Sequence, residues 1–159
     1  MTKNKILVTG AAGYIGGTFT YEVLKKGFEV HGIDNFINSN RCNIDAFLTD
    51  FPEIFGFSEI DLANENTKLE KVLNEFDPDF IVHFAGLKSV GESEEKPDLY
   101  MDNNVGSTRN LLENMKPECF FIFSSSATIY CNNPNQPLNE DSPIEATSVY
   151  GLSKIECEN

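Results

Sequence analysis

Three glycines spaced three residues apart, Gly10, Gly13 and Gly16, follow the apolar run 6–9 and precede a segment with helical periodicity. Glycine permits a tight turn at the first position, close approach of a pyrophosphate at the second, and close packing of a helix on a strand at the third. A helix that begins there points its N-terminal N–H groups at a phosphate. This context predicts a βαβ unit that binds a dinucleotide. A glycine-rich turn without a ligand is the alternative.

Four more apolar segments are typical of buried strands, and we expect them over residues 28–33, 53–60, 80–84 and 119–123. Helices are predicted over 14–26, 67–76 and 97–115 and from Ser148 onward, with a loop over 35–49 that contains one helical turn. Apolar strands that alternate with helices favour a parallel sheet covered on both faces. The sequence therefore predicts a doubly wound α/β (Rossmann) fold with strand order 3-2-1-4-5.

Several side chains are expected to be buried without a catalytic role. The apolar positions of the first helix are Ile15, Phe19, Val23 and Leu24, and those of the fifth strand are Phe120, Phe121 and Phe123. His31 and His83 lie inside apolar strands, where a buried imidazole with hydrogen-bond partners is more common than a catalytic or metal-binding one.

Charge and cysteine content exclude several classes of function. With 12 basic and 25 acidic residues the net charge is -13, which disfavours nucleic acid and anionic membranes as partners and is typical of a solvated surface. A small anionic ligand can still bind to local backbone N–H groups. No metal site is predicted, because no histidine stands at zinc spacing from Cys42, Cys119, Cys131 or Cys157. The short N-terminal segment predicts a cytoplasmic protein without a membrane span.

Asp34 lies 18 residues after Gly16, at the end of the predicted second strand. A carboxylate there accepts hydrogen bonds from the adenosine ribose and repels a 2′-phosphate, so NAD is favoured over NADP. Only Arg41, folding back from the following loop, could reverse this preference. Alternatively Asp34 caps that loop, and Asp61 at the end of the third strand has the same two interpretations.

Tyr150 and Lys154 are separated by one helical turn and share a face of the predicted last helix. The ammonium would stabilise the phenolate and hold a ribose hydroxyl, which makes Tyr150 a candidate general base. Such pairs are common on ordinary helices. This pair gains weight from its position after the fifth strand and the serine cluster 124–126, and together with the glycine turn it indicates hydride chemistry.

Motifs spread over residues 5–154 resemble the extended short-chain dehydrogenase/reductase family, and within it the NAD-dependent UDP-glucose 4-epimerases. They are found at residues 8–16, 34–39, 84–93, 102–105 and 124–130. The run 84–93, Phe-Ala-Gly-Leu-Lys-Ser-Val-Gly-Glu-Ser, is typical of these epimerases rather than of dinucleotide folds in general.

The resemblance implies an enzyme that interconverts UDP-glucose and UDP-galactose through a 4-keto intermediate, with Ser126, Tyr150 and Lys154 as the catalytic group. In that mechanism Tyr150 takes the proton of the sugar 4-OH while C4 gives hydride to the nicotinamide, and Ser126 supports the developing oxyanion. The residues implied in NAD binding are Gly10, Gly13, Tyr14, Ile15, Gly16, Asp34, Asn35, Ser39, Asp61, Leu62, Phe84, Ala85, Gly86, Lys88, Asn103, Ser124, Tyr150 and Lys154.

The chain also departs from its relatives. Ala127 and Thr128 stand where related 4,6-dehydratases carry an Asp-Glu pair, so dehydration is disfavoured. Cys131 replaces a usual glycine. Because the chain ends at Asn159, we expect residues 1–159 to be an incomplete NAD-binding domain that lacks the C-terminal UDP-sugar domain.

Three consequences of this ending are expected. The epimerase activity of the chain alone would be weak or absent. A non-catalytic dinucleotide-binding module is therefore an alternative. Independently of this ending, a related nucleotide-sugar reductase or decarboxylase of the same fold is a third possibility. The fifth strand would expose an apolar edge, which predicts a homo-oligomer or self-association through that edge.

Overall fold

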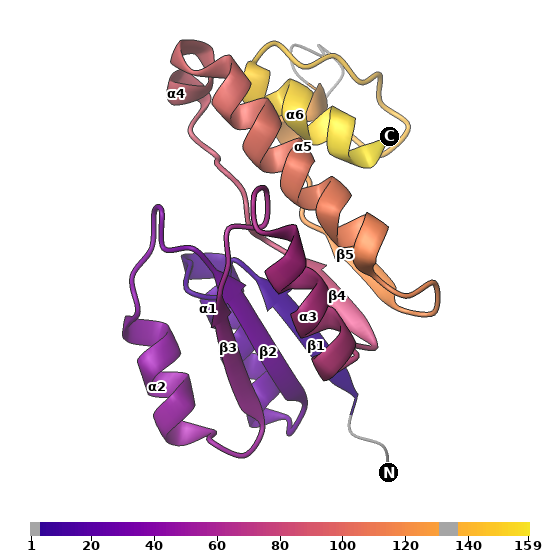
Figure 1. Cartoon of the computed structure of the whole chain (residues 1–159). Coiled ribbons are helices and arrows are strands. Elements are labelled where there is room, and N and C mark those ends of the chain that lie inside the picture. Colours follow the sequence, from indigo (N-terminus) through magenta and orange to yellow (C-terminus); the bar gives the residue numbers. More distant parts are fainter. Residues whose placement is uncertain (1–3, 131–136) are drawn as a thin grey trace.

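A computed structural model of the chain describes residues 4–130 and 137–159. One sheet of five parallel strands has the order β3-β2-β1-β4-β5 (Figure 1). The predicted strand order is confirmed. The strands are β1 (Lys5–Thr9), β2 (Glu29–Asp34), β3 (Phe55–Glu59), β4 (Phe80–His83) and β5 (Phe120–Phe123).

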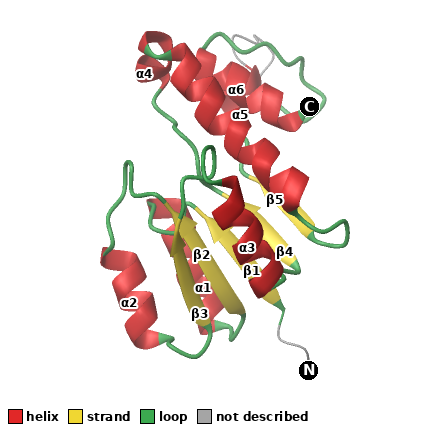
Figure 2. Ribbon diagram, viewed as in Figure 1, coloured by secondary structure: helices red, strands yellow, loops and turns green. Residues whose placement is uncertain are grey.

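Six α-helices and one 3-10 helix connect and cover these strands in the described part of the chain. Figure 2 shows α3 in front of the sheet and α1 behind it, while α5 and α6 pack against each other. The helices are α1 (Tyr14–Lys25), α2 (Cys42–Asp50), α3 (Asn66–Phe76), α4 (Val90–Glu95), α5 (Pro97–Asn114), η1 (Ala127–Tyr130) and α6 (Val149–Glu158).

Alternating side chains of the central strand divide between two hydrophobic cores, one on each face of the sheet. Ile6 and Val8 of β1 belong to the core that includes the buried residues of α1 and α2. Leu7, between them, belongs to the core that includes Leu69 of α3 and Leu111 of α5. The sheet is therefore covered on both faces, as the sequence predicts for parallel strands.

Two helices differ from the sequence-based prediction. Residues 42–50 form a complete helix instead of a loop with one turn, because Ile44 and Phe47 face the core together and anchor it. The short helix α4 was not predicted. Its six residues are too few for a periodic apolar pattern, and it is fixed by the N-cap Ser89, whose side chain accepts a hydrogen bond from the Glu92 N–H.

Ile15 and Phe120, which were predicted to be buried, are exposed, and so is Ile122. Ile15 is 59% exposed because it lies in the first turn of α1 and faces the cleft described below. Phe120 is 67% exposed and Ile122 is 51% exposed, because the other face of β5 packs into the core, where Phe121 is half-buried. Cys131, which stands where relatives usually have a glycine, lies outside the described residues.

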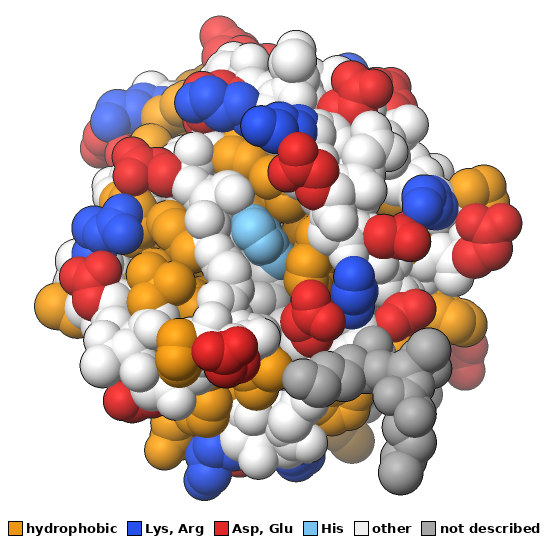
Figure 3. Space-filling model, turned by 60° about the horizontal axis from the view of Figure 1, so that its bottom comes forward, with side chains coloured by type: hydrophobic (Ala, Val, Ile, Leu, Met, Phe, Trp, Pro, Cys, Tyr) orange, Lys and Arg blue, Asp and Glu red, His pale blue; other side chains and the backbone are white. Residues whose placement is uncertain are grey.

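The surface carries both acidic and basic side chains, as expected from a sequence with 25 acidic and 12 basic residues. On the face drawn in Figure 3, acidic and basic side chains are interspersed among apolar ones. Across the described residues, no helix combines the length and the apolar character that a membrane crossing requires. Cys42, Cys119 and Cys157 are free thiols.

Candidate functional site

An open cleft lies at the carboxyl ends of the strands. Its empty volume, including the open mouth, is about 830 Å³. Fifteen of the residues implied in NAD binding line it, namely Gly10, Gly13, Tyr14, Ile15, Gly16, Asp34, Asn35, Asp61, Leu62, Phe84, Ala85, Gly86, Lys88, Asn103 and Ser124. Ile33, Ile37, Asn38, Ile60 and Ser107 complete the lining.

The glycine turn brings backbone close to backbone at one wall of the cleft. Gly10 has φ +69°, and a Cβ there would lie 2.8 Å from the Ala85 nitrogen. A Cβ on Gly16 would overlap the carbonyl oxygen of Gly10. Gly13 is the N-cap of α1, whose first turn contains no acidic residue. The helix N-terminus therefore opens on the cleft with its N–H groups and positive dipole end, an arrangement that suits a phosphate.

The carboxylate of Asp34 fixes the loop after β2 and also lines the cleft. Its Oδ2 accepts a hydrogen bond from the Ala12 N–H (3.0 Å), and its Oδ1 accepts bonds from the Phe36 N–H (2.9 Å) and the Ser39 hydroxyl (2.9 Å). The loop-capping role of Asp34 is thus present in the structure and is compatible with a ribose contact. Ser39 bonds to Asp34 and is not among the lining residues, so its own contact with a cofactor stays a prediction.

Asp61 and Leu62 continue the same wall after β3. Asp61 accepts hydrogen bonds from the Ala63 N–H (3.1 Å) and the Asn64 side chain (2.9 Å). The Asn110 side chain on α5 donates to the Leu62 carbonyl at 2.8 Å. Helix α5 therefore holds this loop in place at the rim of the cleft.

Helix α6 places the buried ammonium of Lys154 next to Ser124, a residue that lines the cleft. Nζ donates to the Ser124 carbonyl (3.0 Å) and lies 4.6 Å from the ring centre of Phe123 and 6.0 Å from that of Tyr150. Burial lowers the pKa of Lys154 from its ordinary value. Within residues 4–130 and 137–159 the Ser124 carbonyl is its one hydrogen-bond acceptor, so two of its three N–H bonds remain for a ligand.

All three residues of the implied catalytic group, Ser126, Tyr150 and Lys154, lie outside the set that lines the cleft. Tyr150 is half-buried beside Lys154 on α6. The Ser126 oxygen accepts hydrogen bonds from the N–H (3.3 Å) and the hydroxyl (2.9 Å) of Thr128, and its own O–H has no acceptor among the described residues. The catalytic roles of all three residues stay predictions.

The sequence did not predict several residues that hold the loops of the cleft in place, because their hydrogen-bond partners are remote in sequence. The buried side chain of Asn104 bonds to both the N–H (2.8 Å) and the carbonyl (3.0 Å) of Leu87 and to the Ser153 hydroxyl (3.0 Å). Asn104 therefore ties the loop after β4 to α6. Asn104 itself belongs to the family motif 102–105, and this was the only signal in the sequence.

The N-terminus of α6 is held by α4. The Ser93 hydroxyl oxygen accepts the Tyr150 N–H (3.1 Å), and the Glu94 carboxylate accepts the Val149 N–H (2.9 Å). Ser148, the N-cap, accepts the Gly151 N–H at 3.0 Å. Three of the first backbone N–H groups of α6 are therefore satisfied, and the turn that carries Tyr150 has a fixed position.

His83 joins β1, β4 and α5 beneath the cleft. Its Nδ1 is 2.6 Å from the Thr9 hydroxyl and its Nε2 is 3.1 Å from the Thr108 hydroxyl. The Thr9 hydroxyl also accepts the Ala85 N–H (3.2 Å), so this network supports the cleft wall. Burial, and then the nearby Lys154 ammonium, lower the pKa of His83 to about 3. The prediction of a buried imidazole with hydrogen-bond partners is confirmed.

Among the described residues, no group of three His, Cys, Asp or Glu side chains is arranged to hold a metal ion. The site therefore consists of backbone N–H groups, carboxylates, amides and one buried ammonium.

Comparison with known proteins places these features in a family. A family model described as GDP-mannose 4,6 dehydratase matches residues 7–159. UDP-glucose 4-epimerase 2 of Oryza sativa subsp. japonica is 42% identical over 159 residues, which cover 97% of this chain and 39% of the rice protein. The chain thus spans less than half the length of this curated relative.

Solved structures give the same result. The crystal structure of UDP-glucose 4-epimerase from Bifidobacterium longum in complex with NAD+ and UDP superposes with a TM-score of 0.89 at 38% identity, covering 98% of this chain and 47% of that one. For the Thermus thermophilus enzyme in complex with NAD, the TM-score is 0.85, the identity 31%, and the coverage 97% and 48%. The chain therefore belongs to the UDP-glucose 4-epimerase family of extended short-chain dehydrogenase/reductases and corresponds to its N-terminal part.

Proposed function

We propose that the chain is the NAD-binding portion of a nucleotide-sugar 4-epimerase of the UDP-glucose/UDP-galactose type. The observation that carries this proposal is a single cleft with the glycine turn and α1 N-terminus at one wall and Ser124, bonded to Lys154, at the other. Residues 1–159 would form an incomplete NAD-binding domain, and the UDP-sugar site would be incomplete as well. A cytoplasmic location stays a prediction from the sequence.

The lining residues give the cofactor a direction along the cleft. Adenosine would lie by Asp34, Asn35, Asp61 and Leu62, and the pyrophosphate would face the N-terminus of α1. The nicotinamide half would lie toward Phe84–Gly86, Lys88, Asn103 and Ser124, which is the end nearest Lys154 and Tyr150.

Bound NAD would supply the hydride acceptor, and residues of the chain itself would take up the proton. Lys154 would donate hydrogen bonds to a ribose hydroxyl and stabilise the Tyr150 phenolate electrostatically. Tyr150 would then take the proton from the sugar 4-OH, and the Ser126 hydroxyl would donate a hydrogen bond to the oxygen as it becomes negative. The buried position of Lys154 strengthens these interactions, because water competes less for them.

The family model is described as a dehydratase, but the residues of this chain favour epimerisation. Elimination of water needs its own acid and base, and Ala127 and Thr128 offer neither a carboxylic acid nor a carboxylate. A related reductase or decarboxylase remains a second candidate that analysis of the product would distinguish.

Calorimetric titration of the chain with NAD tests the proposal. We expect one site per chain, and absence of binding would contradict it. Addition of UDP-glucose or UDP-galactose to the complex, followed by the absorbance of reduced nicotinamide, then separates two cases. Reduction of the cofactor supports an epimerase half-site, whereas binding without reduction supports a non-catalytic dinucleotide-binding module.

A further inference from the structure

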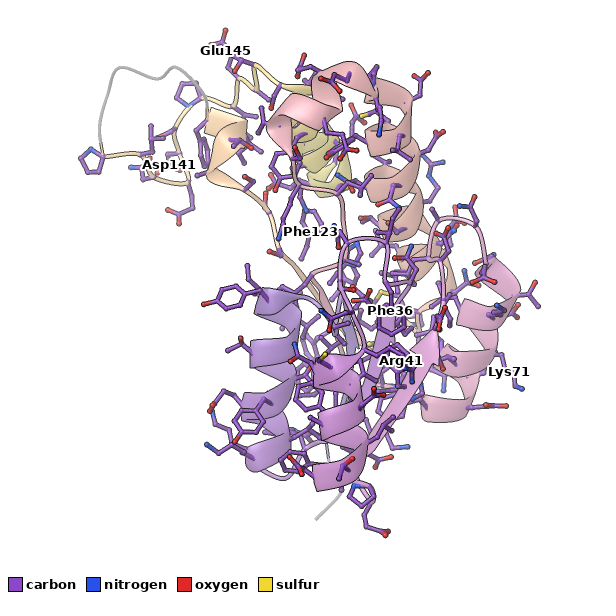
Figure 4. The ribbon with its side chains drawn as sticks, turned by 90° about the vertical axis from the view of Figure 1, so that its left-hand side faces the viewer. Phe36, Arg41, Lys71, Phe123, Asp141 and Glu145 are labelled. Atoms are coloured by element: carbon purple, nitrogen blue, oxygen red, sulfur yellow. The ribbon has the colours of Figure 1, made fainter. Side chains whose placement is uncertain are left out.

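The loop between β2 and α2 holds an arginine in a cage of two carboxylates and two rings. Arg41 Nε is 3.3 Å from Asp45 Oδ1, and Nη1 is 3.7 Å from Glu59 Oε2. The guanidinium carbon lies 5.4 Å and 5.7 Å from the ring centres of Phe36 and Phe57. Figure 4 shows Phe36 and Arg41 next to each other on this side of the molecule. We call these four partners the Arg41 cage.

One side of the Arg41 cage depends on an unusual backbone conformation. Phe36 has φ +57°, a left-handed conformation that bulky residues rarely adopt. Its N–H donates to Asp34 Oδ1, and its ring lies 5.5 Å from the ring of Phe57. Strained residues of this kind persist where the surrounding structure fixes them and are frequent at functional sites. The conformation brings the ring over the guanidinium.

The cage borders the adenosine end of the cleft. Asn35 and Ile37, on either side of Phe36, line the cleft itself. Glu59 lines an adjoining open hollow together with Asn35, Ile37 and Asp61. Arg41 is therefore close to the position where the 2′ substituent of the adenosine ribose would lie. In sites of this fold that bind NADP, a nearby arginine accommodates the 2′-phosphate.

We propose that the Arg41 cage keeps this arginine from binding a 2′-phosphate and thereby makes Asp45 and Glu59 specificity-determining residues against NADP, in addition to Asp34. This inference rests on the proposed function, because it assumes that the cleft binds a dinucleotide. Each exposed ion pair is weak by itself, but two carboxylates and two aromatic faces act on one guanidinium. Removal of the carboxylates should therefore free Arg41 without disturbing the core.

Four proteins test the proposal by calorimetry with NAD and with NADP. They are the wild type, the release variant Asp45→Asn/Glu59→Gln, the release variant with Arg41→Ala, and the control Asp50→Asn/Glu53→Gln. The control also removes two negative charges, but from exposed positions outside the Arg41 cage. Arg41, Asp45 and Glu59 have side chains that are 51%, 62% and 63% exposed, so the variants are expected to fold.

In the release variant we expect the ratio of the NADP to the NAD dissociation constant to fall roughly tenfold, the effect of one charge-assisted contact to the phosphate. Addition of Arg41→Ala should restore the wild-type ratio, and the control should retain it. An unchanged ratio in the release variant, or a fall that persists without Arg41 or appears equally in the control, would overturn the inference. Loss of NAD binding by the wild type would instead overturn the proposed function, and the inference with it.

Discussion

At the scale of single residues, Gly16 has the least room for a side chain. A methyl group there would overlap the Gly10 carbonyl oxygen, so Gly16→Ala must displace α1 from the glycine turn. We expect a loss of about 1–3 kcal/mol in the free energy of unfolding, and NAD affinity at least tenfold weaker, as expected when about 1.4 kcal/mol of binding is lost. Urea unfolding and calorimetry measure the two effects.

Gly91→Ala provides the matched control. Gly91 lies in α4, and a Cβ there would meet nothing within 4 Å. Alanine is also the better helix former, so stability should be unchanged or slightly higher. Normal NAD affinity in Gly16→Ala would show that close packing at the glycine turn is not needed for binding.

His83 makes stability depend on pH. Its pKa is about 3 in the folded protein because burial disfavours the charged ring, whereas the unfolded chain has an ordinary pKa near 6.5. The unfolded state therefore binds more protons as pH falls below about 6.5, and stability decreases from there toward pH 3. Between about pH 7.5 and pH 5 we expect His83 to account for a loss of ~2 kcal/mol in the free energy of unfolding.

Urea unfolding of wild type and His83→Gln at these two pH values tests this expectation. The variant should be less stable at the higher pH, because the contacts with Thr9 and Thr108 change. On acidification, however, the variant should lose ~2 kcal/mol less of its free energy of unfolding than the wild type does. An equal pH dependence in the two proteins would mean that His83 is not the group that titrates.

Sequence reasoning predicts the position of a residue best where that position depends on near neighbours. The glycine turn and Asp34 carry their signal within a few residues of a strand end, so their places at the cleft could be predicted. Asn104 and Ser93 act through partners at Leu87, Ser153 and Tyr150, and only the folded chain brings these together. Both residues lie in the family motifs 84–93 and 102–105, but no local pattern there indicates which partners they bind.

At the scale of elements, α4 determines where α6 begins. Ser93 is completely buried, and its oxygen accepts the N–H of Tyr150. Ser93→Ala leaves that N–H without its partner, and we expect a loss of about 1–2 kcal/mol in the free energy of unfolding. Thermal and urea unfolding measure this loss.

Glu95→Gln is a suitable control, since Glu95 lies at the exposed end of the same helix. It should change stability by less than about 0.5 kcal/mol. Equal stability of Ser93→Ala and the control would contradict the role of α4 as a support for α6.

Element prediction worked where an apolar pattern was long or continuous. The five strands and the helices α1, α3, α5 and α6 were predicted to within a few residues. In α2 only Ile44 and Phe47 are buried, and α4 buries only Ser93. Helix α3 also buries only two residues, but Val72 and Phe76 pack beside Leu69 and Leu73 and complete an apolar periodicity that α2 and α4 lack.

At the scale of the whole molecule, β5 is one of the two edge strands of the described sheet and leaves Phe120 and Ile122 largely exposed. An apolar edge of this kind pairs readily with another chain, so we expect the protein to self-associate at high concentration. Light scattering across a concentration series measures this. Phe120→Lys should shift the chain toward the monomer, while Leu112→Lys, an exposed apolar position on α5, should not. A wild-type chain that stays monomeric would contradict the expectation.

The topology could be predicted because parallel strands with right-handed crossovers allow few arrangements, and strand ends in that order place all the polar clusters at one edge. The nucleotide sugar could not be predicted in the same way. The chain spans less than half the length of these relatives, and the residues that line its cleft are those implied in NAD binding rather than in binding of the sugar.

A crystal structure of the chain with NAD tests the central claim most directly. We predict adenosine beside Asp34, the pyrophosphate at the N-terminus of α1, and the nicotinamide ribose within hydrogen-bonding distance of Lys154 and Tyr150. NAD bound in the reverse direction, or a nicotinamide ring remote from the Tyr150 hydroxyl, would contradict the account.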